Sequence, residues 1–197
     1  RTGVQFEYRG TDLRTGDPTV NFDPAFFGLH TREEHDAEMF RFGFRHSFAP
    51  GSDLIGSFIH RNMQDNTLIR PPLPQIPYDD WIDTEGYGME IQHLYRSDRF
   101  NLITGVGHFN TSSDEIFKVF GMTFPFQSGA RHNNAYLYSR FRFPEDFVWT
   151  VGVSADFFNG GFFDLDRQQF NPKIGVLWTP FLNTTLRGAV FRTFKRT

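Results

Sequence analysis

The chain has 197 residues, a formal net charge of -3 and 26 Phe residues within an aromatic content of 18%. The small net charge and scattered basic residues give no argument for a nucleic-acid partner, and the lack of Cys excludes disulfides, zinc–thiolate sites and a Cys nucleophile. No segment approaches the roughly 18 consecutive apolar residues of a transmembrane helix. No nucleotide-binding or Ser-nucleophile motif is present either, so we expect no enzyme, no catalytic residue and no cofactor.

Nine β-strands are predicted along the chain because apolar and polar side chains alternate with a period of two residues. The alternation is clearest over 147–157, where Phe147, Trp149 and Val151 fall on one face and Thr150 and Gly152 on the other. Most strands are about as long as the roughly 10-residue tilted strand that crosses a bilayer. The predicted strands are 3–9, 37–48, 53–63, 85–96, 99–110, 132–143, 147–158, 170–179 and 184–194.

The predicted connections alternate between short and long. Short turns rich in Pro, Gly, Asp, Asn and Ser are expected at 49–52, 97–98, 144–146 and 180–183. Long connections are expected at 10–36, 64–84, 111–131 and 160–169. Placing every long connection at one end is typical of a bacterial outer-membrane barrel, which has tight periplasmic turns and long extracellular loops.

These features predict an all-β fold, an antiparallel transmembrane β-barrel built as a meander of long hairpins. Residues 1–197 are expected to form one domain, which is a segment of a larger barrel. The chain opens inside a predicted strand and ends on FRTFKRT, which is an unusual end for a barrel strand. An open sheet leaves edge N–H and C=O groups unpaired in lipid, so further strands are expected to close the wall.

The charged face of each strand is predicted to line the lumen. A charge that faces hydrocarbon costs about 2–4 kcal/mol at the midplane of the bilayer, so charged side chains should point inward. Both signs of charge occur on this face, which allows pairing across the interior. The predicted lumen-lining residues are Arg41, Arg45, Glu90, Gln92, Arg140, Arg142, Asp156, Lys173 and Arg187.

The opposite face is predicted to contact lipid, with aromatic residues near the short turns forming an interfacial girdle. Aromatic packing across ordinary hairpins is the alternative explanation for the same residues. The predicted lipid-facing or girdle residues are Phe40, Phe42, Phe44, Tyr95, Phe147, Trp149 and Trp178.

Residues 170–196, FNPKIGVLWTPFLNTTLRGAVFRTFKR, resemble a recurrent hairpin of TonB-dependent outer-membrane receptors. The resemblance implies an outer-membrane location, transport of a solute, contact with outer-membrane lipid, and a periplasmic energy-transducing or envelope partner protein. Similar segments occur in outer-membrane porins that export polysaccharide, which remains an alternative. The residues that carry the resemblance are Phe170, Pro172, Lys173, Gly175, Trp178, Pro180, Thr185, Leu186, Arg187 and Phe191.

Two further alternatives can be stated from the sequence. Asp79, Asp80 and Asp83 form a dense carboxylate run that would suit Ca²⁺, but the D-x-[DN]-x-[DN]-G loop pattern is missing, so no metal site is predicted. A soluble, extracellular all-β binding or structural module would show the same alternation, with its Phe residues facing a second sheet. In that case Phe42 and Val151 would lie beneath other side chains.

Overall fold

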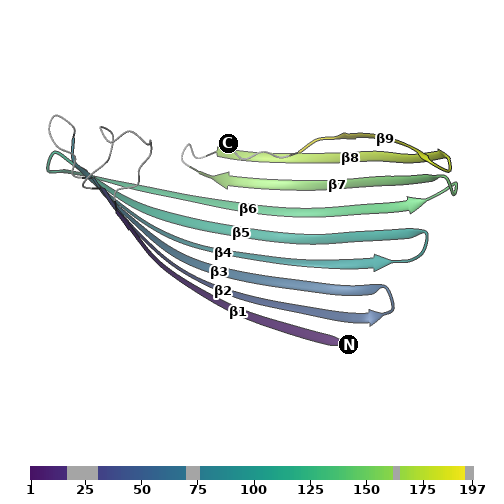
Figure 1. The fold of residues 1–197 in the computed structure, drawn as a ribbon, viewed down its shortest axis with the longest axis horizontal. Coiled ribbons are helices and arrows are strands. Elements are labelled where there is room, and N and C mark those ends of the chain that lie inside the picture. Colours follow the sequence, from purple (N-terminus) through teal and green to yellow (C-terminus); the bar gives the residue numbers. More distant parts are fainter. Residues whose placement is uncertain (17–30, 70–75, 162–164, 194–197) are drawn as a thin grey trace.

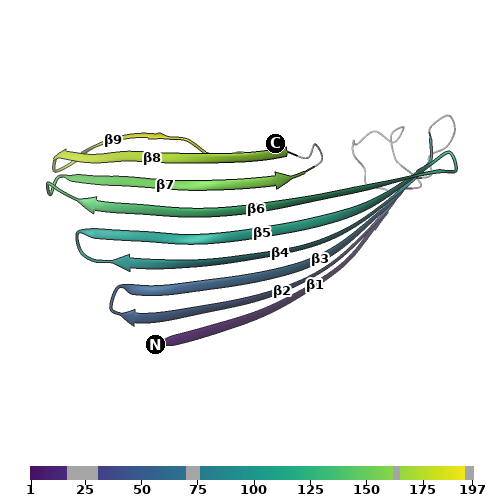
Figure 2. The same cartoon turned by 180° about the vertical axis from the view of Figure 1, so that it is seen from behind.

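A computed structural model describes residues 1–16, 31–69, 76–161 and 165–193 of the chain. These residues form one antiparallel sheet of nine strands whose spatial order follows the chain (Figure 1). Seen from behind, the same unbroken order is evident (Figure 2). The strands are β1 (Thr2–Gly16), β2 (Thr31–Ala49), β3 (Ser52–Ile69), β4 (Tyr78–Arg96), β5 (Phe100–Val119), β6 (Met122–Arg142), β7 (Phe147–Gly160), β8 (Leu165–Phe181) and β9 (Thr184–Phe191).

All nine predicted strands are present, and each pairs with the next one along the chain. The described residues form a single sheet rather than two facing sheets, so the sandwich expected of a soluble module is absent from this part of the chain. Among the same residues, no helix is long and apolar enough to cross a membrane.

The four short turns are confirmed, and all lie at one end of the sheet (Figure 1). The first contains Gly51, whose φ of 80° is readily adopted only by glycine, beside a bulge in β2. A second register irregularity lies in β8 beside its turn into β9. Local chain reversals of this kind are encoded by a few turn-forming residues, which is why the sequence located them.

The prediction of a long loop at 111–131 was wrong. Here β5 and β6 continue, with 20 and 21 residues respectively, and join through a turn of Phe120 and Gly121. Both turn residues have positive φ, 53° and 73°, as a tight type I′ hairpin requires. The other three predicted loops are also shorter than expected: β1 extends to Gly16, β3 to Ile69, and β8 begins at Leu165. Residues 17–30, 70–75 and 162–164 of these predicted loops lie outside the described part of the chain.

The apolar face of the sheet is the more exposed one. Phe42, Val151 and Ile174 are 46%, 41% and 51% exposed, whereas the buried polar residues Asp53, Asp156 and Asn171 are only 4%, 7% and 5% exposed. The register places all three buried polar residues on the opposite face. Among the described residues Phe158 alone is a buried hydrophobic side chain. This distribution is the reverse of that in a water-soluble domain, where apolar side chains fill the core.

Two glycines on the polar face provide a matched test of its packing. A Cβ at Gly152 would lie 2.1 Å from the Tyr138 ring, whereas one at Gly43 would meet nothing nearer than 3.8 Å. We expect Gly152→Ala to lower the free energy of unfolding by about 1–3 kcal/mol through overpacking. Gly43→Ala should be neutral or stabilising by up to about 1 kcal/mol. Urea unfolding of the two variants measures the difference, and equal effects would contradict the packing of Tyr138 over Gly152.

Candidate functional site

The strand register gathers the nine predicted lumen residues on one face of the sheet. Cross-strand pairing places Arg41, Ile59 and Gly88 side by side on β2, β3 and β4. Two residues nearer the short turns, Gly43, Ser57 and Glu90 are paired in the same way. Residues paired directly across antiparallel strands share a face, so these chains of pairs define the face from β2 to β9. The same face holds Gln92, Arg140, Arg142, Asp156, Lys173 and Arg187.

On β1 to β3 the charges of this polar face pair across neighbouring strands. Arg41 Nη1 donates to Glu7 Oε2 at 3.3 Å. Arg45 donates through Nε and Nη2 to the two carboxylate oxygens of Asp53, at 3.2 and 2.8 Å, and Ser47 donates to the same carboxylate at 2.6 Å. The two-pronged guanidinium contact fixes the orientation of both side chains. Predicted lumen charges therefore compensate one another here.

Tyrosine side chains cover the middle of the polar face. Tyr136 donates a hydrogen bond to Glu90, and its hydroxyl lies so close to Gly105 that a Cβ there would be 2.6 Å away. Lys173 Nζ lies 6.0 Å from the centre of the Tyr138 ring, at the outer limit of a cation–π contact. Tyrosine side chains from the next strand thus pack against glycines on this face.

Near the short turns, Arg140 and Arg142 line a hollow of about 180 Å³ together with Arg99 and Asn101. None of these three arginines forms an ion pair with another residue in the described ranges. Arg187 lies two strands away from this hollow, opposite Leu177. The predicted lumen residues therefore form an extended wall with local clusters and do not converge on one centre.

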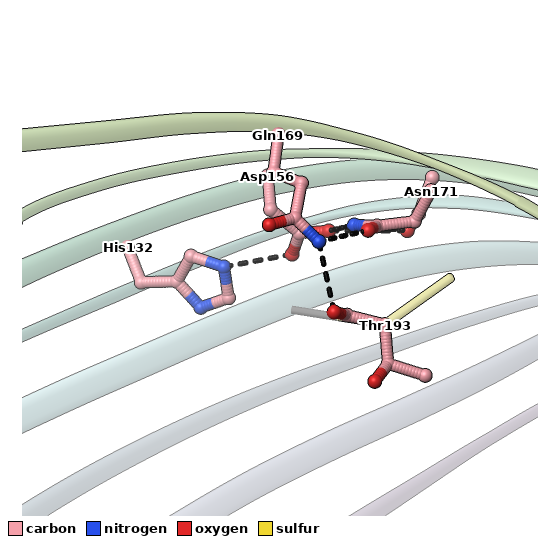
Figure 3. A network of polar contacts seen from close by, with 6 residues as sticks. His132, Asp156, Gln169, Asn171 and Thr193 are labelled. Carbon is pink, nitrogen blue, oxygen red and sulfur yellow. Dashed lines mark hydrogen bonds and ion pairs between the residues drawn. The ribbon is translucent and has the colours of Figure 1, made fainter. Parts of the chain in front are cut away.

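The most enclosed cluster on the wall surrounds Asp156 (Figure 3). Its carboxylate accepts hydrogen bonds from His132 Nε2 at 2.8 Å, Asn171 Nδ2 at 2.7 Å and Ser154 Oγ at 3.1 Å. Gln169 donates to the Asn171 side chain and, at 2.8 Å, to the carbonyl oxygen of Thr193. The network links β6, β7, β8 and the segment after β9, so it fixes the relative positions of three strands and the chain beyond them.

The seven predicted lipid-facing or girdle residues lie together on the opposite, apolar face. Phe147 stacks on Trp149 and Trp178, with ring centres 6.1 and 5.5 Å apart, and Trp149 Nε1 donates to the Phe143 carbonyl at 3.0 Å. Tyr95 lies 6.3 Å from the Phe100 ring. These aromatic groups sit beside the short turns, while Phe40, Phe42 and Phe44 lie farther along β2.

The three candidate metal ligands do not point to a common place. Asp79 and Asp83 lie on the apolar face, on either side of Trp81, and Asp80 lies on the polar face. Burial raises the pKa of the Asp80 carboxyl. No group of three or more His, Asp or Glu residues in the described ranges has the spacing to hold a metal ion.

The predicted lumen-lining residues did not include His132, Asn171 and Asp53. Their positions in the alternation place them on the polar face, so the face itself was predictable. The contacts among these residues were not predictable, because Asp156 and Asn171 lie on adjacent strands and meet only through the register of β7 and β8.

The geometry defines the class of protein: a segment of wall with one polar and one apolar face, assembled as a meander from strands long enough to cross a bilayer. The sequence matches the model of the TonB-dependent receptor-like β-barrel over residues 1–197. The chain therefore belongs to the TonB-dependent receptor β-barrel family, a family of outer-membrane receptors and transporters. No curated protein matches the sequence.

Solved structures of receptors share this fold at low sequence identity. The alcaligin outer-membrane receptor FauA from Bordetella pertussis is 15% identical with a TM-score of 0.63, covering 95% of this chain and 31% of that one. The siderophore receptor PiuA from Acinetobacter baumannii is 8% identical with a TM-score of 0.66, covering 81% of this chain and 32% of that one. The copper transporter OprC is 12% identical with a TM-score of 0.66, covering 82% and 31%. The chain thus spans about a third of the length of these proteins.

Proposed function

We propose that this chain is part of the barrel wall of a receptor that takes up a solute across the outer membrane. The apolar face contacts lipid, and the polar face lines the passage. The observation that carries the proposal is the inverted distribution of side chains: the apolar face is the exposed one, and the buried polar residues lie on the other face. In water such a face would be costly, whereas in a bilayer it is the favourable arrangement.

The extent of the apolar face supports this orientation. On β4 it runs from Tyr95 beside the short turn to Tyr87, beyond which Glu85 and Asp83 follow on the same face. At about 3.4 Å per residue this stretch is about 27 Å long. A strand tilt of about 40° reduces its height to about 20 Å, close to the ~25 Å apolar band of outer-membrane barrels.

The charge of the polar face suggests the class of solute. Arg9 and Arg61 lie at the same level on this face, because both are in register with Met39. Between the short turns and that level, cationic side chains outnumber acidic ones. A cationic passage favours an anionic solute. Several related structures are receptors for metal-binding siderophores, so we propose an anionic metal chelate. The cationic residues are Arg9, Arg41, Arg45, Arg61, Arg96, Arg140, Arg142, Arg167, Lys173 and Arg187, and the acidic ones are Glu7, Asp53, Glu90 and Asp156.

The rest of the proposal concerns assembly. We propose that residues 1–197 act as one domain of the wall, without enzymatic activity, and that a periplasmic TonB-type protein supplies energy. Outer-membrane lipid is the other partner. Strands β1 and β9 run in the same direction in this meander, so an antiparallel barrel needs an odd number of further strands between their free edges. We propose that the remainder of the protein supplies them.

Cysteine labelling tests the two faces directly, since these 197 residues contain no Cys and any Cys elsewhere in the protein can be replaced by Ser. In the full-length protein in membranes, Val151→Cys should react with a lipid-soluble maleimide and resist a water-soluble one. Thr150→Cys, the adjacent residue on the polar face, should show the opposite preference. Equal reaction of both variants with the water-soluble reagent would refute the lipid contact of the apolar face.

Uptake assays test the transport itself. Cells that depend on the full-length receptor should accumulate radiolabelled iron supplied as an anionic chelate, and an uncoupler of the proton-motive force should abolish the accumulation. Double substitution of Arg140 and Arg142 by Gln should lower uptake of the anionic chelate more than uptake of a neutral one. Accumulation that is unaffected by loss of the receptor would contradict the proposal.

A further inference from the structure

A groove of about 570 Å³ lies on the apolar face of the sheet. Phe42, Phe44, Phe58 and Phe157 are among the large residues that line it, and Gly56 and Ala135 contribute little or no side chain. The Phe44 ring lies against Gly56 so closely that a Cβ there would be 2.1 Å from it. Gly56 and Ala135 lie at the two ends of one row across the strands, with Ile91 and Val106 between them, so the small residues leave a depression among larger apolar neighbours.

One end of the groove is polar. His108 and Asn133 line it and hydrogen-bond to each other, His108 Nδ1 to Asn133 Oδ1 at 2.6 Å, and the Tyr87 ring lies 5.6 Å from the imidazole. Arg131 precedes Asn133 by two residues on the same face of β6 and lies about 7 Å farther from the short turns. Arg131 is exposed and forms no ion pair with the described residues.

We propose that this groove binds one acyl chain of a phosphate-bearing lipid of the outer leaflet, with the phosphate on Arg131. The inference rests on the proposed lipid contact of the apolar face and adds a specific site to it. A peptide in the groove would bury backbone N–H and C=O groups without partners, because the sheet's own backbone is already paired. A hydrocarbon chain has no such groups, and its single polar end matches the single polar end of the groove. The volume falls within the ~300–1,000 Å³ of ligand sites.

Photocrosslinking tests the site in the full-length protein reconstituted in vesicles that contain a phospholipid with a diazirine in its acyl chain. Mass spectrometry should find more crosslinks at Ile91 and Val106, in the groove, than at Val151, on the same face outside it. Ala135→Trp should fill the groove and reduce labelling of Ile91 and Val106 to the level of Val151. Ile174→Trp, a bulky change on the same face outside the groove, should leave the labelling of Ile91 and Val106 unchanged.

The headgroup is tested with two probes, the phospholipid and an uncharged diacylglycerol with the same chain. Arg131→Gln should lower groove labelling by the phospholipid about fivefold and leave the diacylglycerol unaffected. Arg32→Gln, an exposed arginine on the same face away from the groove, should change neither.

The outcomes separate the two proposals. Uniform labelling of the apolar face, insensitive to Ala135→Trp, would overturn the groove site and leave the lipid contact standing. A photoreactive amino acid placed at position 91 that crosslinks to a second receptor copy and not to lipid would overturn it in favour of self-association. Absence of labelling anywhere on the apolar face would overturn the proposed function as well.

Discussion

Replacing Val151 by Arg is expected to lower the free energy of unfolding of the receptor in a bilayer by about 2–4 kcal/mol. Val151 lies on the exposed apolar face, near the middle of β7. The reason for the loss is the cost of placing a guanidinium in the hydrocarbon core. The measurement is urea unfolding of the full-length protein in phospholipid vesicles, followed by the gel mobility of unheated samples.

Thr150→Arg is the matched control, one residue away on the polar face. It lies opposite Arg140, so repulsion between like charges should cost no more than about 1 kcal/mol. Equal losses for the two variants would show that both faces meet the same environment. That result would contradict the assignment of the apolar face to lipid.

Asp156→Ala is expected to lower the free energy of unfolding by about 3 kcal/mol. The substitution removes the acceptor for His132, Ser154 and Asn171, and buried donors without partners lose more than the net value of their hydrogen bonds. Asp156→Asn, which keeps one side-chain oxygen as acceptor, should cost less. Urea unfolding of the same protein in vesicles measures both.

Asp166→Ala provides the comparison for Asp156. Asp166 is exposed on the apolar side of β8 and forms no side-chain hydrogen bond within the described ranges. Its removal should change the free energy of unfolding by no more than about 0.5 kcal/mol. If Asp156→Ala were as mild as Asp166→Ala, the network in Figure 3 would not stabilise the wall.

The limits of sequence reasoning are visible at the loop end of the strands. On β2 the apolar residues stop near Phe40, and toward Thr31 both faces become mostly polar, yet the strand continues to pair with β3 up to Ile69. Periodicity reports which face is apolar, and it vanishes where both faces are hydrated. Backbone pairing does not vanish there, so the strands were predicted too short and the hairpin tip at Phe120 and Gly121 was taken for part of a long loop.

The sequence by itself determined the number of strands, their antiparallel meander, the short turns and the membership of each face, because side-chain alternation and turn chemistry are local properties. Only the tertiary structure decided which residues meet across strands, such as Asp156 with Asn171 and Phe44 with Gly56. Those contacts depend on register, which no single strand specifies alone. The groove on the apolar face has the same origin, since it arises where large and small side chains from six strands come into line.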